Sequence, residues 1–118
     1  MTQIVQMVHI VAWRLQGETA QQRRQQADAV VAAVEALRGR IPGLVALDVG
    51  INLVAAPEAW DVGAVMMFAS RADLDAYHEH PAHLDLKRIV GPLRSARAQL
   101  DFERTVAANG DTHPKGRS

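Results

Sequence analysis

Hydrophobic and polar residues alternate in some segments of the chain and recur every three or four positions in others. Alternation, or a run of apolar β-branched residues, indicates strands, whereas the longer spacing indicates helices. The strands predicted in this way cover residues 4–15, 44–53, 61–69 and 96–103, and the helices cover residues 19–38 and 71–90. This order predicts an α+β domain of the ferredoxin-like βαββαβ plan, with a four-stranded antiparallel sheet and helices on one face.

Capping and helix-breaking residues mark the ends of the predicted helices. Thr19 followed by Gln22 is a capping-box pattern at the start of the first helix, and Gly39 is placed to end it in a left-handed conformation. Pro81 cannot continue a helix, because it lacks an N–H, but it can begin one. We therefore predict that one helix ends near His80 and that another starts near Pro81.

The faces of the predicted strands indicate that two copies of the chain associate. The first strand is apolar on both faces, which is typical of a central strand covered on both sides. The segment 44–53 has one apolar face that includes Val45 and Leu47, and it carries Asp48, Gly50 and Asn52 on the other. Helices on one face leave the second face bare, and no sequence remains to cover it. We therefore predict a homodimer in which two sheets pack together with twofold symmetry.

Composition and charge narrow the class of protein. The 118 residues carry 13 basic and 13 acidic side chains, which argues against a dedicated nucleic-acid or anionic-membrane binder. The longest apolar runs, such as residues 64–69, are far shorter than a membrane span, and no leader pattern is seen, so we expect a cytoplasmic protein. The absence of Cys excludes thiolate chemistry. The length predicts one domain over residues 1–104, with a flexible polar tail at 105–118.

Most side chains that titrate near neutral pH lie at residues 75–86, where the sequence reads DAYHEHPAHLDL. Three interpretations are open. His80 can cap the helix junction while His83 bonds a neighbouring group. His78, His80 and His83 can supply imidazoles to a metal, but residues two apart on a helix point in different directions, and we assign no metal. Alternatively, a His can move a proton on carbon while Tyr77 donates to an enolate oxygen.

Several short motifs resemble the stress-responsive dimeric alpha/beta barrel family, Dabb. The signature YHEHPAH contains Tyr77, His80, Pro81 and His83, and the other matches are 8–11 (VHIV), 41–44 (IPGL) and 101–103 (DFE). The resemblance covers residues 7–103. It implies a stress-responsive homodimer whose two sheets form a barrel.

The resemblance also implies candidate catalytic residues. A plant member of the family closes a poly-β-keto chain by aldol condensation, using a Tyr and a His of the signature with other His residues around the pocket. The positions that match are Tyr77, His83 and His9, whereas Val62 stands where the cyclase has a further His. The resemblance therefore implies a pocket for a small organic ligand, with acid–base catalysis similar to polyketide cyclisation and no cofactor.

Two other functions stay open at the level of sequence. One is a non-catalytic stress-responsive or scaffold dimer, in which the barrel serves only for assembly. The other is a cofactor-free oxygenase, which has a barrel of this kind. The sequence therefore leaves open whether the protein is an enzyme.

Overall fold

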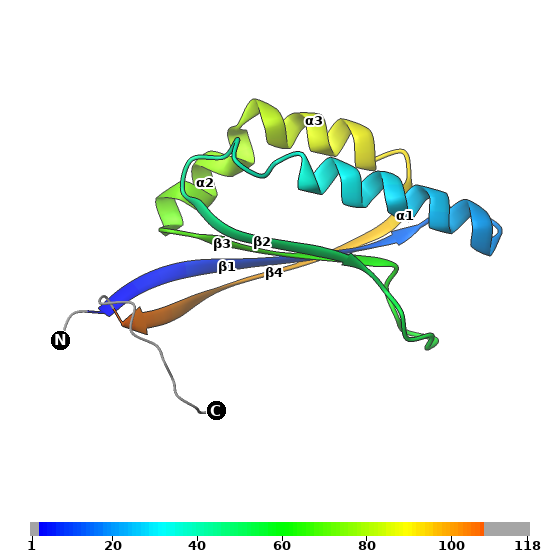
Figure 1. Cartoon of the computed structure of the whole chain (residues 1–118), viewed down its shortest axis with the longest axis horizontal. Helices are drawn as coiled ribbons and strands as arrows, with labels where there is room; N and C mark the ends of the chain where they lie inside the picture. Colours follow the sequence, from blue (N-terminus) through cyan, green and yellow to red (C-terminus); the bar gives the residue numbers. More distant parts are fainter. Residues whose placement is uncertain (1–2, 108–118) are drawn as a thin grey trace.

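The computed structural model describes residues 3–107, which form one sheet covered on one face by helices (Figure 1). The elements in chain order are β1 (Gln3–Leu15), α1 (Ala20–Glu35), β2 (Leu44–Ile51), β3 (Val62–Phe68), α2 (Arg71–Glu79), α3 (Pro81–Val90) and β4 (Arg94–Ala107). This is the predicted ferredoxin-like βαββαβ arrangement. The prediction of a break between two helices at His80 and Pro81 is also confirmed.

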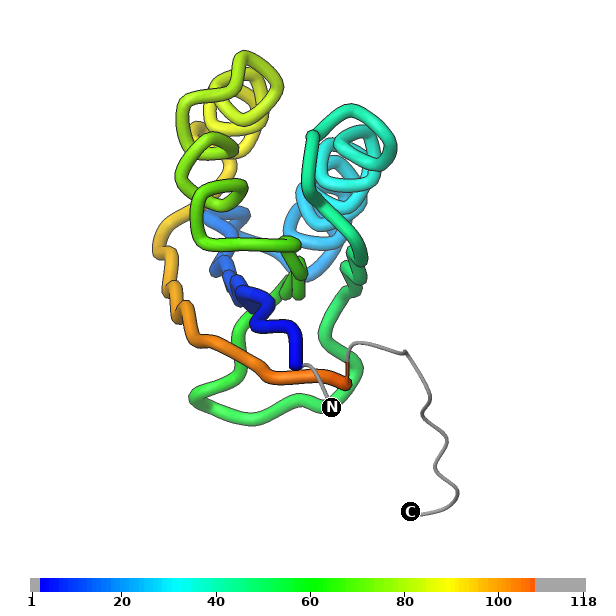
Figure 2. Tube along the Cα trace, turned by 90° about the vertical axis from the view of Figure 1, so that its left-hand side faces the viewer, coloured from blue at the N-terminus to red at the C-terminus, as the bar shows by residue number. Residues whose placement is uncertain are grey.

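The four strands are antiparallel and lie in the order β2-β3-β1-β4. β1 is central, and its residue His9 lies opposite Met66 of β3 on one side and Asp101 of β4 on the other. Above the sheet, α1 lies over the β2 side, whereas α2 and α3 lie over the β4 side (Figure 2). The topology thus brings the signature helices next to the first and last strands.

The two faces of the sheet differ in what they contact. On β1, the buried side chains His9, Val11 and Trp13 face the helices, and the intervening residues point to the uncovered face. β4 follows the same alternation through its pairing with β1, so its polar residues Gln99 and Asp101 share the helix side. Its apolar residues therefore lie on the uncovered face, where they are exposed.

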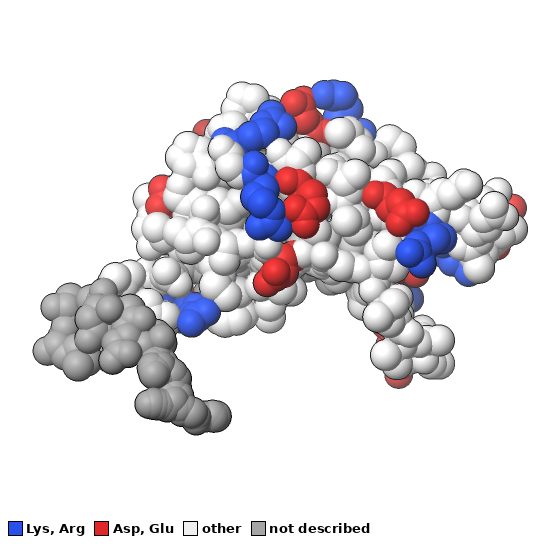
Figure 3. All heavy atoms as spheres, viewed as in Figure 1, with Lys and Arg blue, Asp and Glu red and all other residues white. Residues whose placement is uncertain are grey.

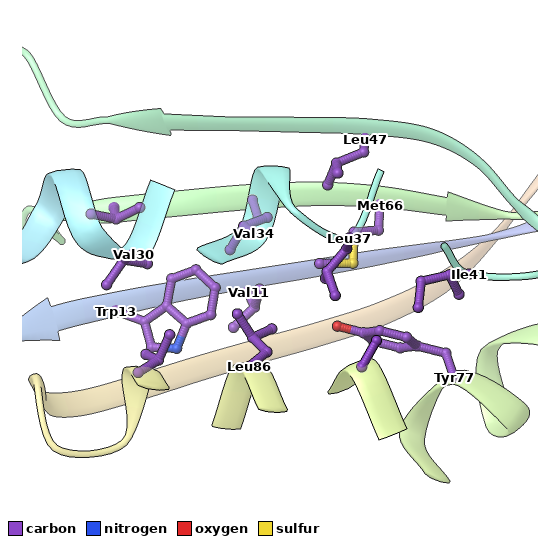
Figure 4. Packing of buried hydrophobic residues seen from close by; sticks show 14 of the residues in the cluster. Val11, Trp13, Val30, Val34, Leu37, Ile41, Leu47, Met66, Tyr77 and Leu86 are labelled. Atoms are coloured by element: carbon purple, nitrogen blue, oxygen red, sulfur yellow. The ribbon is translucent and has the colours of Figure 1, made fainter. Parts of the chain in front are cut away.

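The core lies between the sheet and the helices. α1 contributes Val30 and Val34, and the turn that follows it contributes Leu37; all three are fully buried against Met66 and other strand residues (Figure 4). Truncating a buried aliphatic side chain of this kind to Ala typically costs about 2–5 kcal/mol. This packing fixes the helices over the sheet and so determines the space that remains beside α3.

The predicted capping interactions at α1 are confirmed. The Thr19 hydroxyl accepts a hydrogen bond from the Gln22 backbone N–H at 3.1 Å, and the Gln22 side chain accepts in return from the Thr19 N–H. The helix ends at Glu35, three residues before the predicted Arg38, and a turn follows. Gly39 in that turn has a φ of 80°, which is the left-handed conformation expected of it.

The structure corrects two predicted boundaries. β2 ends at Ile51 rather than at residue 53. The register between β2 and β3 shifts between Leu44 and Ala46, so Val45 is exposed instead of sharing the buried face with Leu47. A bulge of this kind adds one residue to the alternation. β4 continues to Ala107 because it pairs with β1 as far as Gln3, so 105–107 are strand; the remainder of the expected tail lies outside the described residues.

Charged side chains of both signs are interspersed on the face of the molecule seen in Figure 3. Several pairs lie three or four residues apart on one helix, including Arg24 with Asp28 and Arg71 with Asp75. Within residues 3–107, no helix has both the length and the apolar character needed to cross a membrane.

Candidate functional site

A cavity of about 430 Å³ lies beside α2 and α3, against β1 and β4. Its lining combines a buried apolar floor with aromatic, imidazole and cationic groups. The lining residues are His9, Val11, Trp13, Met66, Tyr77, His78, His83, Leu86, Lys87, Val90, Gly91, Arg94, Arg97 and Gln99. The three residues predicted from the sequence, His9, Tyr77 and His83, therefore line one cavity, although they come from three different elements.

His9 lies on the central strand and is only 2% exposed. Its Nδ1 is 2.6 Å from Oδ1 of Asp101, which is its partner across the β1–β4 ladder. A carboxylate only accepts, so Nδ1 of His9 donates and Nε2 of the neutral ring keeps its lone pair. Burial lowers the pKa of His9, and the hydrogen bond and charge of Asp101 only partly oppose that effect. His9 is thus held as a neutral base of fixed tautomer.

Asp101 belongs to a hydrogen-bonded row along the inner face of β4. Its Oδ2 accepts from the Gln99 side-chain amide at 2.7 Å, and Gln99 Oε1 in turn accepts from Arg97 at 2.8 Å. Partial burial would raise the pKa of Asp101, but the hydrogen bonds from Gln99 and His9 outweigh it and lower the pKa. The carboxylate therefore stays ionised beside His9 near neutral pH.

His83 lies on the first turn of α3 and is also buried. Its Nδ1 is 3.1 Å from the backbone carbonyl of His78, and a carbonyl can only accept, so Nδ1 carries the proton. Burial lowers the pKa of His83, and the bond to His78 opposes this only in part. His83 is therefore neutral near pH 7, with Nε2 as its remaining basic atom.

Tyr77 is the centre of a cluster of rings. Its ring centroid is 4.5 Å from that of His83, 5.7 Å from that of His78 and 6.3 Å from that of His9. Figure 4 shows the hydroxyl directed into the interior, and no hydrogen bond joins it to any residue between 3 and 107. Burial raises the pKa of Tyr77 far above its ordinary value, with Arg97 opposing the shift. The hydroxyl thus remains a proton donor at all moderate pH values.

His80 has a different role from its neighbours. It is the last cap of α2 and the first cap of α3, and its Nδ1 accepts a hydrogen bond from the Ala82 N–H at 3.0 Å. It does not line the cavity. The structural interpretation of this histidine is therefore correct. Among residues 3–107, no group of three or more His, Cys, Asp or Glu side chains is arranged to hold a metal ion.

Sequence reasoning did not assign a catalytic role to His78 or any role to Arg97 and Asp101. Asp101 lay within a matched motif, 101–103, but its contact with His9 depends on strand pairing between the two ends of the chain. Arg97 and Gln99 carried no signal beyond the polar alternation of the last strand. His78 stands only one position from Tyr77, and it lines the cavity while its carbonyl orients His83.

Comparison with known proteins identifies the family. The family model for Dabb, the stress responsive A/B barrel domain, matches residues 7–104. The chain belongs to this family. Most of the described fold, including the Dabb signature helices and the residues His9 and Asp101, lies within the matched range.

Solved structures share the Dabb fold of this chain. A dimeric protein of unknown function with a ferredoxin-like fold from Bacteroides fragilis is 25% identical, with a TM-score of 0.73 over 84% of this chain and 96% of that one. A Dabb family protein from Mesorhizobium loti is 20% identical, with a TM-score of 0.65 over 83% and 95% of the respective chains. A hydroxynitrile lyase from Passiflora edulis is 19% identical, with a TM-score of 0.70 over 92% and 97%. The curated proteins contain no match to this chain.

Proposed function

We propose that this Dabb protein binds a small organic carbonyl compound in the cavity and catalyses proton transfer at the carbon next to the carbonyl. The observation that carries the proposal is the lining of one cavity by a neutral His83, a neutral His9 and a protonated Tyr77. A base with a free Nε2 and a donor that cannot ionise are the two groups that enolisation requires.

The proposed reaction begins when His83 Nε2 takes a proton from the carbon α to the carbonyl. The electron pair of the broken C–H bond moves onto the carbonyl oxygen, and the Tyr77 hydroxyl stabilises the resulting enolate by donating a hydrogen bond. In a poly-β-keto chain, the enolate carbon then attacks a second carbonyl carbon, and a ring C–C bond forms. The proton held by His83 neutralises the new alkoxide, so acid and base return to their starting states.

His9 and Asp101 supply a second acid–base group for the same cavity. Protonation of His9 at Nε2 would place a positive charge beside the ionised Asp101, 2.6 Å from Nδ1, and the carboxylate would stabilise that charge. His9 is therefore proposed to accept at Nε2 the proton that His83 removed and to pass it to the second carbonyl oxygen, so both rings end neutral. This division of roles resembles polyketide cyclisation.

Exchange of α-protons tests this function without knowledge of the natural substrate. The probe is ethyl 3-oxohexanoate, a neutral 3-oxoester, whose α-protons are followed by NMR in D₂O. The protein should accelerate exchange over buffer, and His83→Gln and Tyr77→Phe should each reduce the acceleration by about 100-fold or more. His80→Ser, outside the cavity, should leave it unchanged. Exchange no faster than in buffer, or unchanged in both cavity variants, would overturn the catalytic proposal and leave the alternative of a non-catalytic stress-responsive dimer.

We also propose that two copies pair through the uncovered face of the sheet. Figure 1 shows all three helices on the opposite face. The uncovered face presents exposed Ile4, Leu100 and Phe102, and burying apolar area of this kind is favourable by about 25 cal/mol per Å². The segment between β2 and β3 extends beyond the sheet on that same side, with Leu53 91% exposed. The dimeric state of the Bacteroides fragilis relative supports the same arrangement.

A further inference from the structure

The charges around the cavity are of one sign. Three cationic side chains line it, Lys87 from α3 and Arg94 and Arg97 from β4, and no Asp or Glu is among the lining residues. All three cationic residues are exposed, whereas the floor residues Trp13 and Leu86 are buried. The cavity therefore has an apolar floor and a cationic rim.

The three rim cations form no ion pair with any carboxylate in the part of the chain that the structure describes. Arg88, the next residue along α3, shows the contrast, because it pairs with Asp85. Arg97 donates one bond to a neutral acceptor, the Gln99 side-chain oxygen, which leaves its other N–H groups for a ligand.

The nearest carboxylate cannot neutralise this rim. Asp101 lies on the same face of β4, but one of its oxygens is bonded to His9 and the other accepts from Gln99. Burial lowers the pKa of Arg97, and repulsion by Arg94 lowers it further, so these two cations are close enough to repel each other. An anion placed between them would relieve the repulsion and accept hydrogen bonds from both.

We infer that the ligand of this cavity carries an anionic head group, carboxylate or phosphate, on an apolar body. The head lies at the rim against Arg94, Arg97 and Lys87, and the body lies on the floor formed by Trp13, Val11 and Leu86. This inference rests on the proposed function for the position of the reacting carbon, which lies between head and body, beside Tyr77 and His83. The rim thereby selects acids over neutral compounds and fixes which end of the molecule enters the cavity.

Three matched probes test the inference: 2-naphthoate, 2-naphthyl phosphate and the neutral 2-naphthamide. Binding is measured by isothermal titration calorimetry and located through the Trp13 indole N–H resonance. At least one of the two anions should bind about tenfold or more tightly than the amide, since a hydrogen bond to a charged group is worth about 1.5–3 kcal/mol. The ranking of naphthoate and phosphate then distinguishes a carboxylate head from a phosphate head.

Variants locate the effect at the rim. Arg97→Gln and Lys87→Gln should each weaken binding of the preferred anion several-fold and leave the amide unaffected. Arg97→Lys, which retains the charge, should recover part of the loss. Arg88→Gln is the matched control and should change the affinity for neither probe. Added salt should weaken the binding of the anion but not that of the amide, because screening acts on exposed charges.

Equal affinity for all three probes, no binding of either anion, or an effect of Arg88→Gln as large as that of Arg97→Gln would overturn the inference. The outcome is independent of the exchange experiment above, because that experiment uses a neutral ester and this one measures binding alone. Anion selectivity without exchange, at ester concentrations raised until the protein is saturated, would refute catalysis and retain the cationic site. Exchange without selectivity would retain catalysis and refute the cationic site.

Discussion

Asp101 Oδ1 lies 2.6 Å from Nδ1 of His9, although 92 positions separate the two residues in the chain. The contact joins the central strand to an edge strand and fixes the tautomer of a buried imidazole. Because Asp101 opposes the effect of burial on His9, its charge makes His9 a stronger base than burial alone would allow.

Asp101→Asn should therefore lower the pKa of His9 further, because the substitution removes the negative charge that favours the imidazolium form. NMR titration of the His9 ring resonances measures the change directly. Glu103→Gln is the matched control, since Glu103 lies on the same face of β4 but pairs with Met7. An unchanged pKa of His9 in the Asp101 variant would show that the charge of Asp101 does not favour the imidazolium form of His9.

Stability should decrease as the pH falls below about 6.5, the ordinary pKa of His in an unfolded chain. The folded state lowers the pKa of both His9 and His83, so the unfolded chain binds more protons in this range. The free energy of unfolding then rises with pH, by at most about 1.4 kcal/mol per pH unit for each proton of difference. The contribution is complete above the unfolded pKa and is lost progressively as the pH falls toward the lowered folded value.

Urea denaturation at several pH values between about 5 and 8 checks this dependence. His83→Gln should flatten the profile, because it removes one of the two buried groups. Asp101 affects stability in a different pH range. Its pKa is lowered from 3.8, so its contribution to the free energy of unfolding is lost only at more acid pH. A flat profile between pH 5 and 8 in the unmodified protein would contradict the assignment of both histidines as neutral.

Tyr77→Phe should leave the free energy of unfolding unchanged or raise it by up to about 1–2 kcal/mol. The ring is 2% exposed, and its hydroxyl has no hydrogen-bond partner among residues 3–107, so removal of the oxygen relieves a desolvation cost. Tyr77→Ala, by contrast, should cost about 3–5 kcal/mol because it leaves a void against Phe68 and His83. Thermal and urea melts separate the two effects, and a large loss in the Phe variant would indicate that the hydroxyl is structurally bonded.

His80→Ala should destabilise the protein by about 0.5–2 kcal/mol, because the Ala82 N–H loses its acceptor at the start of α3. His80→Ser should recover most of that stability, since a hydroxyl can cap the same N–H. Both variants should retain α-proton exchange, measured per folded molecule. Loss of exchange in the stable Ser variant would place His80 in the catalytic machinery, contrary to its position outside the cavity.

Leu100→Asp should dissociate the proposed dimer. Leu100 is 58% exposed in a single chain, so the substitution costs a monomer little and acts mainly on the pairing of two sheets. Leu84→Asp on α3, with Leu84 52% exposed, is the matched control on the helix side. Sedimentation velocity at micromolar concentration should show a dimer for the unmodified protein and the control. A monomer in the unmodified protein would remove the sheet-to-sheet pairing altogether.

Local patterns in the sequence were sufficient to predict the fold, but they predicted only part of the candidate site. The capping box at Thr19, the break at Pro81 and the alternation of the last strand each depend on neighbouring residues, and all three predictions are confirmed. The exposure of Val45 was missed because a bulge changes the phase of alternation without changing the composition of the strand.

The site depends on contacts between distant parts of the chain. His9, Tyr77 and His83 were predicted through the family resemblance, whereas Asp101 and Arg97 required the register between β1 and β4. Alternation shows that a strand has a polar face, but it cannot show whether that face meets solvent or a cavity. On β4 the polar residues Gln99 and Asp101 face the helices, and the exposed apolar residues Leu100 and Phe102 face away.

His80 caps two helices at once, the end of α2 and the start of α3, and this shared cap limits how the chain can change in length. Each residue advances an α-helix by about 100° and 1.5 Å. One inserted residue between His80 and His83 would therefore rotate His83, Leu86 and Val90 together and carry them away from the cavity. An insertion in the exposed segment between β2 and β3 would move none of them. The three-residue interval from the capping histidine to the buried one is thus a requirement in itself, independent of which side chains occupy it.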